Sequence, residues 1–298
     1  MNAHDTKPRR KRQAWLILLP VGLLVLLGLG LAIPGSPLYL PKLLEPEPAV
    51  DGRTTSQLVA ALGSEDKEQR ERAAIDLGRM NTAGRKALPE LIRVMRTDAS
   101  ADVRAVAADA AGKMFPANEP ETAVAEYVSA VLEAFTAGLT DPDKRVRHNS
   151  AIGLLKLKAK ARPAVPVLLE AIKDPENDTN MQIYLATIRQ VMLRALGEAA
   201  AGTADAVPTF TAILNEKVER PSSQGGGRVQ ASKESIELAT KYAETSVNRR
   251  IAVCGLGLAG EHARDTAPKI RELLKSPEAD DRFEAKQALE RMGLPAEE

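Results

Sequence analysis

The chain contains few of the residues on which catalytic and ligand-binding sites usually depend. Its 298 residues include one cysteine, three histidines and one tryptophan, and aromatic residues make up only 3% of the total. A single cysteine excludes an intramolecular disulfide. We therefore expect packing alone to hold the fold, with Cys254 as a small buried hydrophobe on the inner stripe of a helix. Scarce aromatic side chains also leave few platforms on which nucleic-acid bases could stack.

The charge balance argues against a nucleic-acid partner as well. Residues 1–13 contain five of the 41 basic residues and one of the 40 acidic residues. The rest of the chain therefore has 36 basic and 39 acidic residues, a net charge of −3. Nucleic-acid-binding domains are expected to be basic, so the sequence predicts no nucleic-acid partner.

Known catalytic motifs are missing. His4, His148 and His262 lack the spacing of metal ligands, and we interpret His148 and His262 as solvated surface residues. The run Gly225–Gly227 lacks the Gly-Lys-Ser/Thr of a phosphate loop. Nucleophile elbows and paired catalytic carboxylates do not appear either. We therefore expect no enzyme activity, no catalytic residue, no cofactor and no metal.

What the chain does contain is one arginine-led motif that recurs along most of its length. The third residue after the Arg is small, the seventh is aliphatic and the eighth is often Gly. In most copies the nineteenth residue after the Arg is Pro. The arginines that lead the motif are Arg70, Arg104, Arg147, Arg189, Arg249 and Arg282. Such recurrence is typical of a repeat protein, and repeat proteins usually bind other molecules.

Each repeat reads as a pair of helices. Ala73, Ala74 and Leu77 have helical spacing, and Pro89 stands where a second helix begins. Glycines in the motif (Gly78, Gly112, Gly197 and Gly257) either terminate the first helix or allow the second to cross closely. Acidic residues at the turns between repeats (Asp98, Asp141 and Asp174) favour helix N-caps.

The spacing between copies predicts where the regular pattern is interrupted. The longest interval contains a Gly-rich insertion at about 217–230, which reads as a flexible loop. Residues 229–246 after it look helical. Half-repeats are expected at both ends, at 56–62 and 277–292.

The chain resembles the HEAT-repeat family, including the HEAT-like repeats of the bilin-lyase type. The resemblance is clearest in the stretches 141–147, 164–169 and 248–257. The resemblance covers residues 55–293. It implies an all-α fold, a right-handed α-solenoid of about five helix pairs plus a terminal half-repeat, with the second helices on the concave side. HEAT-repeat deoxyhypusine hydroxylases use several His-Glu pairs for a di-iron site, and this chain lacks them.

The repeated arginines have two interpretations. An Arg at one register of every repeat can bond turn carbonyls or aspartates of the adjacent repeat and form a structural ladder. The alternative is a row that binds a ligand. We favour the ladder.

Outward positions on the second helices are the better candidates for binding a partner. If the family geometry holds, these residues line the concave face: Glu90, Arg93, Arg96, Glu170, Lys173, Thr209, Lys269 and Glu272. Their mixed charge fits a polar protein partner. The sequence therefore predicts a protein–protein interaction scaffold. A substrate-holding subunit of a bilin-lyase-like enzyme and an architectural spacer at the envelope remain alternatives.

The N-terminal segment predicts attachment to a membrane. Residues 14–33 form an uncharged apolar run, which as a helix spans about 30 Å, enough for a bilayer core. Basic residues precede it, so residues 1–13 are predicted to be a cytoplasmic tail and the repeats to be extracytoplasmic. Residues 34–53 read as a Pro-rich spacer before a solenoid at 54–298. The alternative is a cleaved signal peptide, with Gly30 and Ala32 before the cut and a secreted solenoid.

Overall fold

The computed structural model describes residues 46–115, 125–179, 186–217 and 233–296. Residues 48–298 form one compact unit. The predicted tail, the apolar run 14–33 and most of the Gly-rich insertion lie outside the described residues. Within the described residues, no helix is both long enough and apolar enough to span a bilayer.

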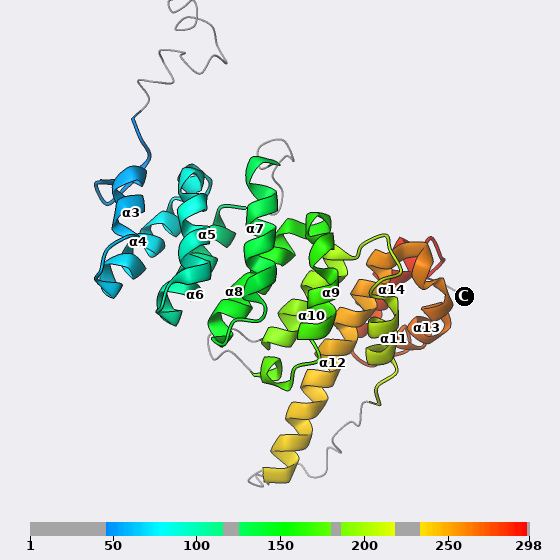
Figure 1. Ribbon diagram of the computed structural model, residues 1–298. Helices are drawn as coiled ribbons and strands as arrows, with labels where there is room; N and C mark the ends of the chain where they lie inside the picture. The colour runs from blue at the N-terminus through cyan, green and yellow to red at the C-terminus, as the bar shows by residue number, and fades with distance from the viewer. Residues whose placement is uncertain (1–45, 116–124, 180–185, 218–232, 297–298) are drawn as a thin grey trace, which may run out of the picture. The chain divides into compact units, whose positions relative to one another are not determined.

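The compact unit consists of helix pairs, as the sequence predicts (Figure 1). We name the first helix of each pair helix A and the second helix B. A single helix, α3 (Thr55–Ala61), precedes five pairs in the described residues, and a lone helix A, α14 (Ala279–Arg291), follows them. The pairs are α4 (Lys67–Arg79) with α5 (Leu88–Thr97), α6 (Ala101–Lys113) with α7 (Ala125–Gly138), α8 (Lys144–Leu157) with α9 (Val165–Ala171), α10 (Ile188–Ala199) with α11 (Val207–Leu214), and α12 (Lys233–Ala259) with α13 (Ala267–Leu273).

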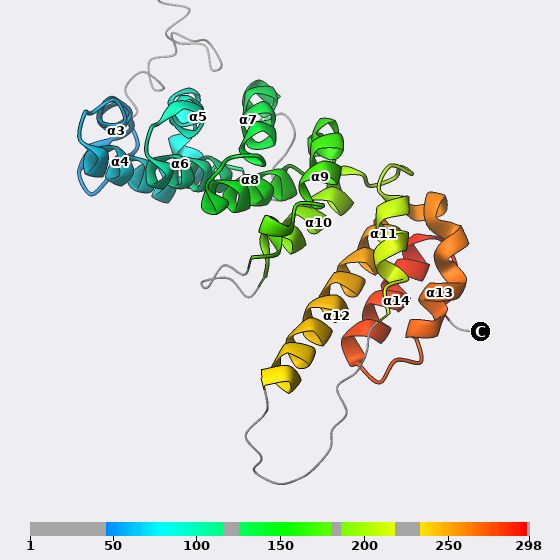
Figure 2. The same cartoon turned by 60° about the horizontal axis from the view of Figure 1, so that its bottom comes forward.

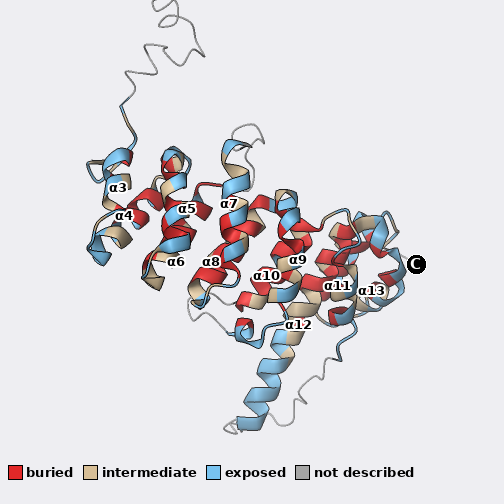
Figure 3. Cartoon of the chain, viewed as in Figure 1, coloured by how far each residue is buried: buried red, intermediate tan, exposed pale blue. Residues whose placement is uncertain are grey.

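Helices A of successive repeats pack side by side, and each helix B packs against helices A (Figure 2). The buried side chains lie between these two layers (Figure 3). Alanines fill much of the contact between helices A, because a small side chain lets two backbones approach closely. Ala73, Ala74, Ala107 and Ala108 are each 0% exposed. The predicted helical stripe of small residues is therefore the seam between repeats.

The motif glycines lie inside helix A and do not terminate it. A Cβ added at Gly197 would lie 3.3 Å from the Cα of Gly255, and one added at Gly257 would lie 2.8 Å from the Cα of Ala288. The close approach is thus to helix A of the next repeat, and the expectation of a crossing by helix B was wrong. The C-terminal turn after α12 uses Gly260 instead, whose φ of +63° suits glycine.

Short 3₁₀ segments connect helix A to helix B in three repeats: η1 (Asn81–Ala87), η3 (Lys158–Ala164) and η5 (Gly260–Thr266). The motif prolines follow them as the second residue of helix B, where a missing N–H costs no hydrogen bond. A fourth 3₁₀ segment, η4 (Pro175–Asp178), lies in the turn before α10.

A small hairpin precedes α3. Strands β1 (Ala49–Val50) and β2 (Arg53–Thr54) pair antiparallel around Asp51 and Gly52. Both turn residues have positive φ, +49° and +78°, as a two-residue hairpin turn requires. The all-α expectation did not include this hairpin, although Asp-Gly is a hairpin signal.

Candidate functional site

The predicted partner-binding residues lie on helices B of four repeats. Glu90, Arg93 and Arg96 belong to α5, Thr209 to α11, and Lys269 with Glu272 to α13; Glu170 is in α9 and Lys173 follows its end. All eight are exposed or half-buried. We call them together the helix B face. They stand one, four or seven residues after the motif proline of their helix, and their place on a concave surface stays a prediction.

Ion pairs on the helix B face are mostly local. Three pairs have i,i+3 spacing: Glu90–Arg93 at 2.6 Å, Glu170–Lys173 at 2.7 Å and Lys269–Glu272 at 2.8 Å. Arg96 reaches Glu133 of the neighbouring α7 at 3.2 Å. Exposed pairs of this kind contribute little stability, about 0–1 kcal/mol. The charges therefore remain free to exchange their local partners for those of a bound molecule.

A cavity of about 240 Å³ lies beside part of the helix B face. Lys269 and Glu272 line it together with Lys217, Glu216 and Arg249. The lining thus combines two predicted residues of α13 with the turn that follows α11. Both signs of charge are present, as on the rest of the face.

The repeated arginines form the predicted structural ladder. Arg70 donates through Nε and Nη2 to the carboxylate of Asp98 at 2.7 and 2.9 Å, and through Nη1 to the carbonyl oxygen of Ser64 at 3.0 Å. Arg104 repeats this arrangement with Asp141, at 2.9 Å for both bonds. Two further pairs continue the ladder at 2.8 Å each, Arg147–Asn177 and Arg249–Asp281. The first three of these arginines thereby tie their own N-terminal turns to the next repeat, and Arg249 ties the middle of α12 to α14.

The ladder changes at Arg189. Its Nη1 donates to Asp178, in the turn before its own helix, at 3.1 Å. Its Nε is buried and has no partner in the part of the chain that the structure describes. Among the residues that the structure describes, the α10–α12 junction therefore has no arginine link like those that join the other repeats.

The sequence suggested that Asp98 and Asp141 are helix N-caps. In the structure they accept the hydrogen bonds of the ladder instead. The N-caps are Ser100 and Asp143, whose backbone N–H groups donate to Asp98 and Asp141 at 2.9 and 2.8 Å. Asp174 does cap a helix, the 3₁₀ segment η4. Burial alone would raise the pKa of Asp98, but hydrogen bonds from Arg70 and the Ser100 N–H lower it overall.

The structure contains a second series of arginines, which was not predicted from the sequence. Arg85, Arg162 and Arg264 each stand four residues before a motif proline. Arg85 donates to the carbonyl oxygen of Met114 at 2.8 and 2.9 Å, and Arg264 to that of Met292 at 2.9 Å. Arg162 donates to the carbonyl of Ala201 at 2.9 Å. These carbonyls lie at the C-terminal ends of the next helices A. The Arg-to-Pro spacing was the available signal.

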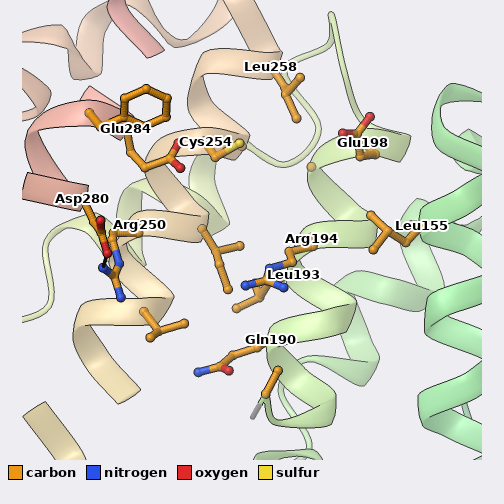
Figure 4. A pocket seen from close by; sticks show the side chains of 16 residues that line it. Leu155, Gln190, Leu193, Arg194, Glu198, Arg250, Cys254, Leu258, Asp280 and Glu284 are labelled. Carbon is orange, nitrogen blue, oxygen red and sulfur yellow. Dashed lines mark hydrogen bonds and ion pairs between the residues drawn. The ribbon is translucent and has the colours of Figure 1, made fainter. Parts of the chain in front are cut away.

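A larger cavity lies on the opposite layer, among helices A. Its volume is about 540 Å³, and residues of α8, α10, α12 and α14 line it (Figure 4). The apolar lining includes Leu193, Ile251 and Leu258, and Arg194 and Glu198 stand on α10. We call this cavity the helix A cleft. No residue of the predicted helix B face contributes to it.

Cys254 lines the helix A cleft and is half-buried. Its Sγ lies 3.5 Å from Nη1 of Arg291. The expectation of a buried inner-stripe position was therefore wrong, because the junction of α10 and α12 leaves this side of α12 open.

His148 is buried, with 1% of its surface exposed, and the expectation of a solvated residue was wrong for it. It lies in α8, which helices A on both sides cover. Burial lowers the pKa of the imidazole below its ordinary value of 6.5, and a hydrogen bond with Asn149 offsets only part of this. His262 is exposed, as expected.

Stability should therefore depend on pH through His148. With a folded-state pKa below 6.5, the unfolded chain binds the proton more readily, so stability is full above pH 6.5 and falls as the pH drops below it. The slope for one proton is at most about 1.4 kcal/mol per pH unit. Urea unfolding between pH 5 and 7 checks this. His148→Gln should flatten the dependence and His262→Gln should not; an unchanged slope in His148→Gln contradicts the assignment.

Among the described residues, no group of three or more His, Cys, Asp or Glu side chains could hold a metal ion.

Comparison with known proteins finds no matching family model and no matching curated protein. Solved structures do match. An engineered protein is 21% identical with a TM-score of 0.54, over 80% of this chain and 96% of its own. A designed armadillo repeat protein in complex with the peptide (KR)4 is 16% identical with a TM-score of 0.54, over 79% and 98%.

The CpcE–CpcF complex of phycocyanin lyase from Nostoc sp. PCC7120 matches at 24% identity, over 84% of this chain and 91% of its own. Its TM-score of 0.42 is too low to bear on fold or function. The matches above 0.5 agree with the helix pairs, and they show the fold alone: this chain has an armadillo-like α-helical repeat fold.

Proposed function

We propose that this chain is a scaffold that binds a protein partner on its helix B face. The observation that carries the proposal is the recurrence of exposed charged residues of both signs on three of the helices B, at α5, at α9 with the following Lys173, and at α13. The arginine ladder joins the repeats that contain α5 and α9, so it holds the charges of these two helices at a fixed spacing. A partner with an extended segment could pair with several repeats at once, as multi-repeat binding requires.

The designed armadillo repeat protein supports this proposal by analogy, since it was solved with the peptide (KR)4. The helix B face of this chain has both signs of charge, because Glu90 and Glu170 alternate with Arg93 and Lys173. We therefore propose a partner segment of mixed charge. We propose no catalytic role and nominate no catalytic residue.

The test is affinity capture of the full-length protein from mildly solubilised membranes after crosslinking in cells. Reversal of charge at Glu90, Arg93, Glu170 and Lys173 should abolish capture of a stoichiometric partner. The matched control reverses Asp109 and Lys113, an exposed pair on α6 with i,i+4 spacing. Both variants should unfold like the unaltered protein because exposed pairs contribute little. Equal loss of the partner in both would contradict the helix B face.

Two alternatives predict other results. A substrate-holding subunit of a bilin-lyase-like enzyme would carry a bound chromophore or cofactor when purified from its own cells. An architectural spacer would show no specific partner, and deletion of a whole repeat would change only its reach.

We also propose that residues 14–33 anchor the protein in a membrane, with residues 1–13 in the cytoplasm and the repeats outside it. The length and apolarity of the run and the basic residues before it support this proposal. Alkaline extraction should leave the protein in the membrane fraction with residues 1–13 intact by mass spectrometry. A soluble product beginning after Ala32 would favour the cleaved signal peptide and a secreted protein.

A further inference from the structure

The N-terminal half of α12 is not buried by the described parts of the compact unit. None of the residues from 233 to 245 is buried, whereas burial begins at Ser246. Ile236 is 55% exposed and Leu238 is 39% exposed. We call residues 233–245 the arm; it projects beyond the other helices (Figures 1 and 3). At 1.5 Å per residue the arm is about 20 Å long.

The arm continues the surface that lines the helix A cleft. Four stripe residues of α12 line the cleft, at positions 247, 251, 254 and 258. Steps of three and four residues carry the same stripe into the arm at 243, 240 and 236. The stripe residues are Ile236, Thr240, Ala243, Val247, Ile251, Cys254 and Leu258. One helix therefore supplies both the floor of a cleft and an exposed face of the same kind.

The spacing of this stripe is the same in both directions. From Ile236 to Leu258 the steps are 4, 3, 4, 4, 3 and 4 residues, with Val247 at the centre. Two antiparallel copies related by a two-fold axis at Val247 thus bring every stripe residue opposite another. Ile236 meets Leu258 and Ala243 meets Ile251, so the arm of each copy covers the cleft floor of the other.

The flanks of the cleft match the flanks of the arm. The α10 side of the stripe is the side of Gly255, because Gly197 and Gly255 approach closely. Glu244 lies eleven residues before Gly255, about three turns, and so points to the same side. A two-fold axis brings like sides together, so Glu244 of one copy comes to Arg194 on α10 of the other. Neither of these exposed residues has an ion pair in the described part of the chain.

The α14 side of the cleft combines an exposed aromatic ring with three charged residues, Arg250, Asp280 and Glu284, of which the first two form an ion pair. It is the side of Gly257, which meets Ala288 of α14. Ala239 lies eighteen residues, about five turns, before Gly257 and points to that side, with Tyr242 next to it. On α14 the ring of Phe283, which also lines the cleft, is 62% exposed. The arm therefore presents small and aromatic surface where the cleft presents an exposed phenylalanine.

From these observations we propose that the helix A cleft binds the arm of a second copy of this chain, which produces an antiparallel, two-fold symmetric dimer centred on Val247. The interface is isologous, as in most homodimers. It uses the layer opposite to the helix B face, so a dimer could present two such faces. The proposal does not depend on the function proposed for that face.

Disulfide crosslinking of the full-length chain in detergent tests the register. Thr240→Cys should form a disulfide with Cys254 of the second copy and give a covalent dimer on oxidation. Thr240 and Cys254 of one chain are about 21 Å apart along the helix, too far for an internal bond. The unaltered chain should stay uncrosslinked, and so should the variant that combines Thr240→Cys with Cys254→Ala. In both, the single cysteine of one copy lies about 21 Å along the helix from that of the other copy. Val247→Cys with Cys254→Ala should crosslink at the two-fold axis.

Mass measurement with paired variants tests the surface. The unaltered chain should be a dimer by sedimentation equilibrium. Ala243→Lys, on the stripe, should make it a monomer, whereas Glu234→Lys, on the opposite side of the arm, should leave it a dimer. Arg194→Glu should weaken the dimer, and a second change of Glu244→Arg should restore it. A monomeric unaltered chain, or a dimer that Ala243→Lys leaves intact or that lacks the two crosslinks, overturns the proposal.

Discussion

Replacement of Asp281 by alanine should cost about 3 kcal/mol of the free energy of unfolding. Asp281 is 2% exposed and accepts hydrogen bonds from Nη2 of Arg249 at 2.8 Å and from the hydroxyl of Ser276 at 2.9 Å. The Arg249 side chain is only 18% exposed, and its Nε already has no partner among the described residues. Removal of the carboxylate leaves a mostly buried guanidinium without its counter-charge, which is the expensive case.

The neighbouring aspartate provides a matched control. Asp280 pairs with Arg250 at 2.5 Å, but its side chain is 76% exposed. Asp280→Ala should change the unfolding free energy by no more than about 1 kcal/mol. Urea unfolding of the three proteins, followed by circular dichroism, measures both effects. If both variants lose the same free energy of unfolding, burial of the Arg249–Asp281 pair does not determine how much that pair stabilises the fold.

Alanine at Gly153 or Gly255 should destabilise the fold by about 1–3 kcal/mol each through overpacking. An added Cβ would lie 2.4 Å from the ring of Phe135 in the first case and 2.4 Å from the ring of Phe210 in the second. Both rings are fully buried, so neither can move aside without displacing the helices that enclose it. The same relation, a glycine of helix A against a phenylalanine of helix B, thus occurs in two repeats.

Thermal unfolding compares these variants with Gly63→Ala. A Cβ at Gly63 would meet only the carbonyl oxygen of Ala60, at 3.4 Å, so that variant should keep or slightly raise the melting temperature. Phe135→Leu should recover part of the loss caused by Gly153→Ala, because it vacates the space that the new methyl group needs. A Gly153→Ala protein as stable as the original would show that the ring has room to shift.

The repeat architecture was predictable because its signals are local and recur. Arg70, Ala73 and Leu77 fall at helical spacing, and Pro89 marks the start of the next helix; five further arginines repeat the register. The ladder was predictable for the same reason, since a residue type that returns at one position in each repeat meets an equivalent neighbour in most of them, with Arg189 as the exception. The residues that recur at the same position of the motif were thus the ones that the sequence predicted best.

The misplaced residues depend on contacts between repeats. His148 and Cys254 both lie in helix A, and nothing in their local sequence tells whether the neighbouring helix covers that side. His148 is buried because α8 has a close helix A on each side. Cys254 is half-buried because it faces the cleft between α10 and α12.

The sequence by itself determined the helix pairs, their number and the positions that face outward on helix B, because helical periodicity and turn residues act within one repeat. Only the tertiary structure decided which glycines permit close crossing, which arginines bridge repeats through carbonyl oxygens, and where two neighbouring helices A leave a cleft. These features depend on the distance between elements that lie 30 to 60 residues apart in the chain. That distance is set by how side chains from separate repeats pack, which no local pattern encodes.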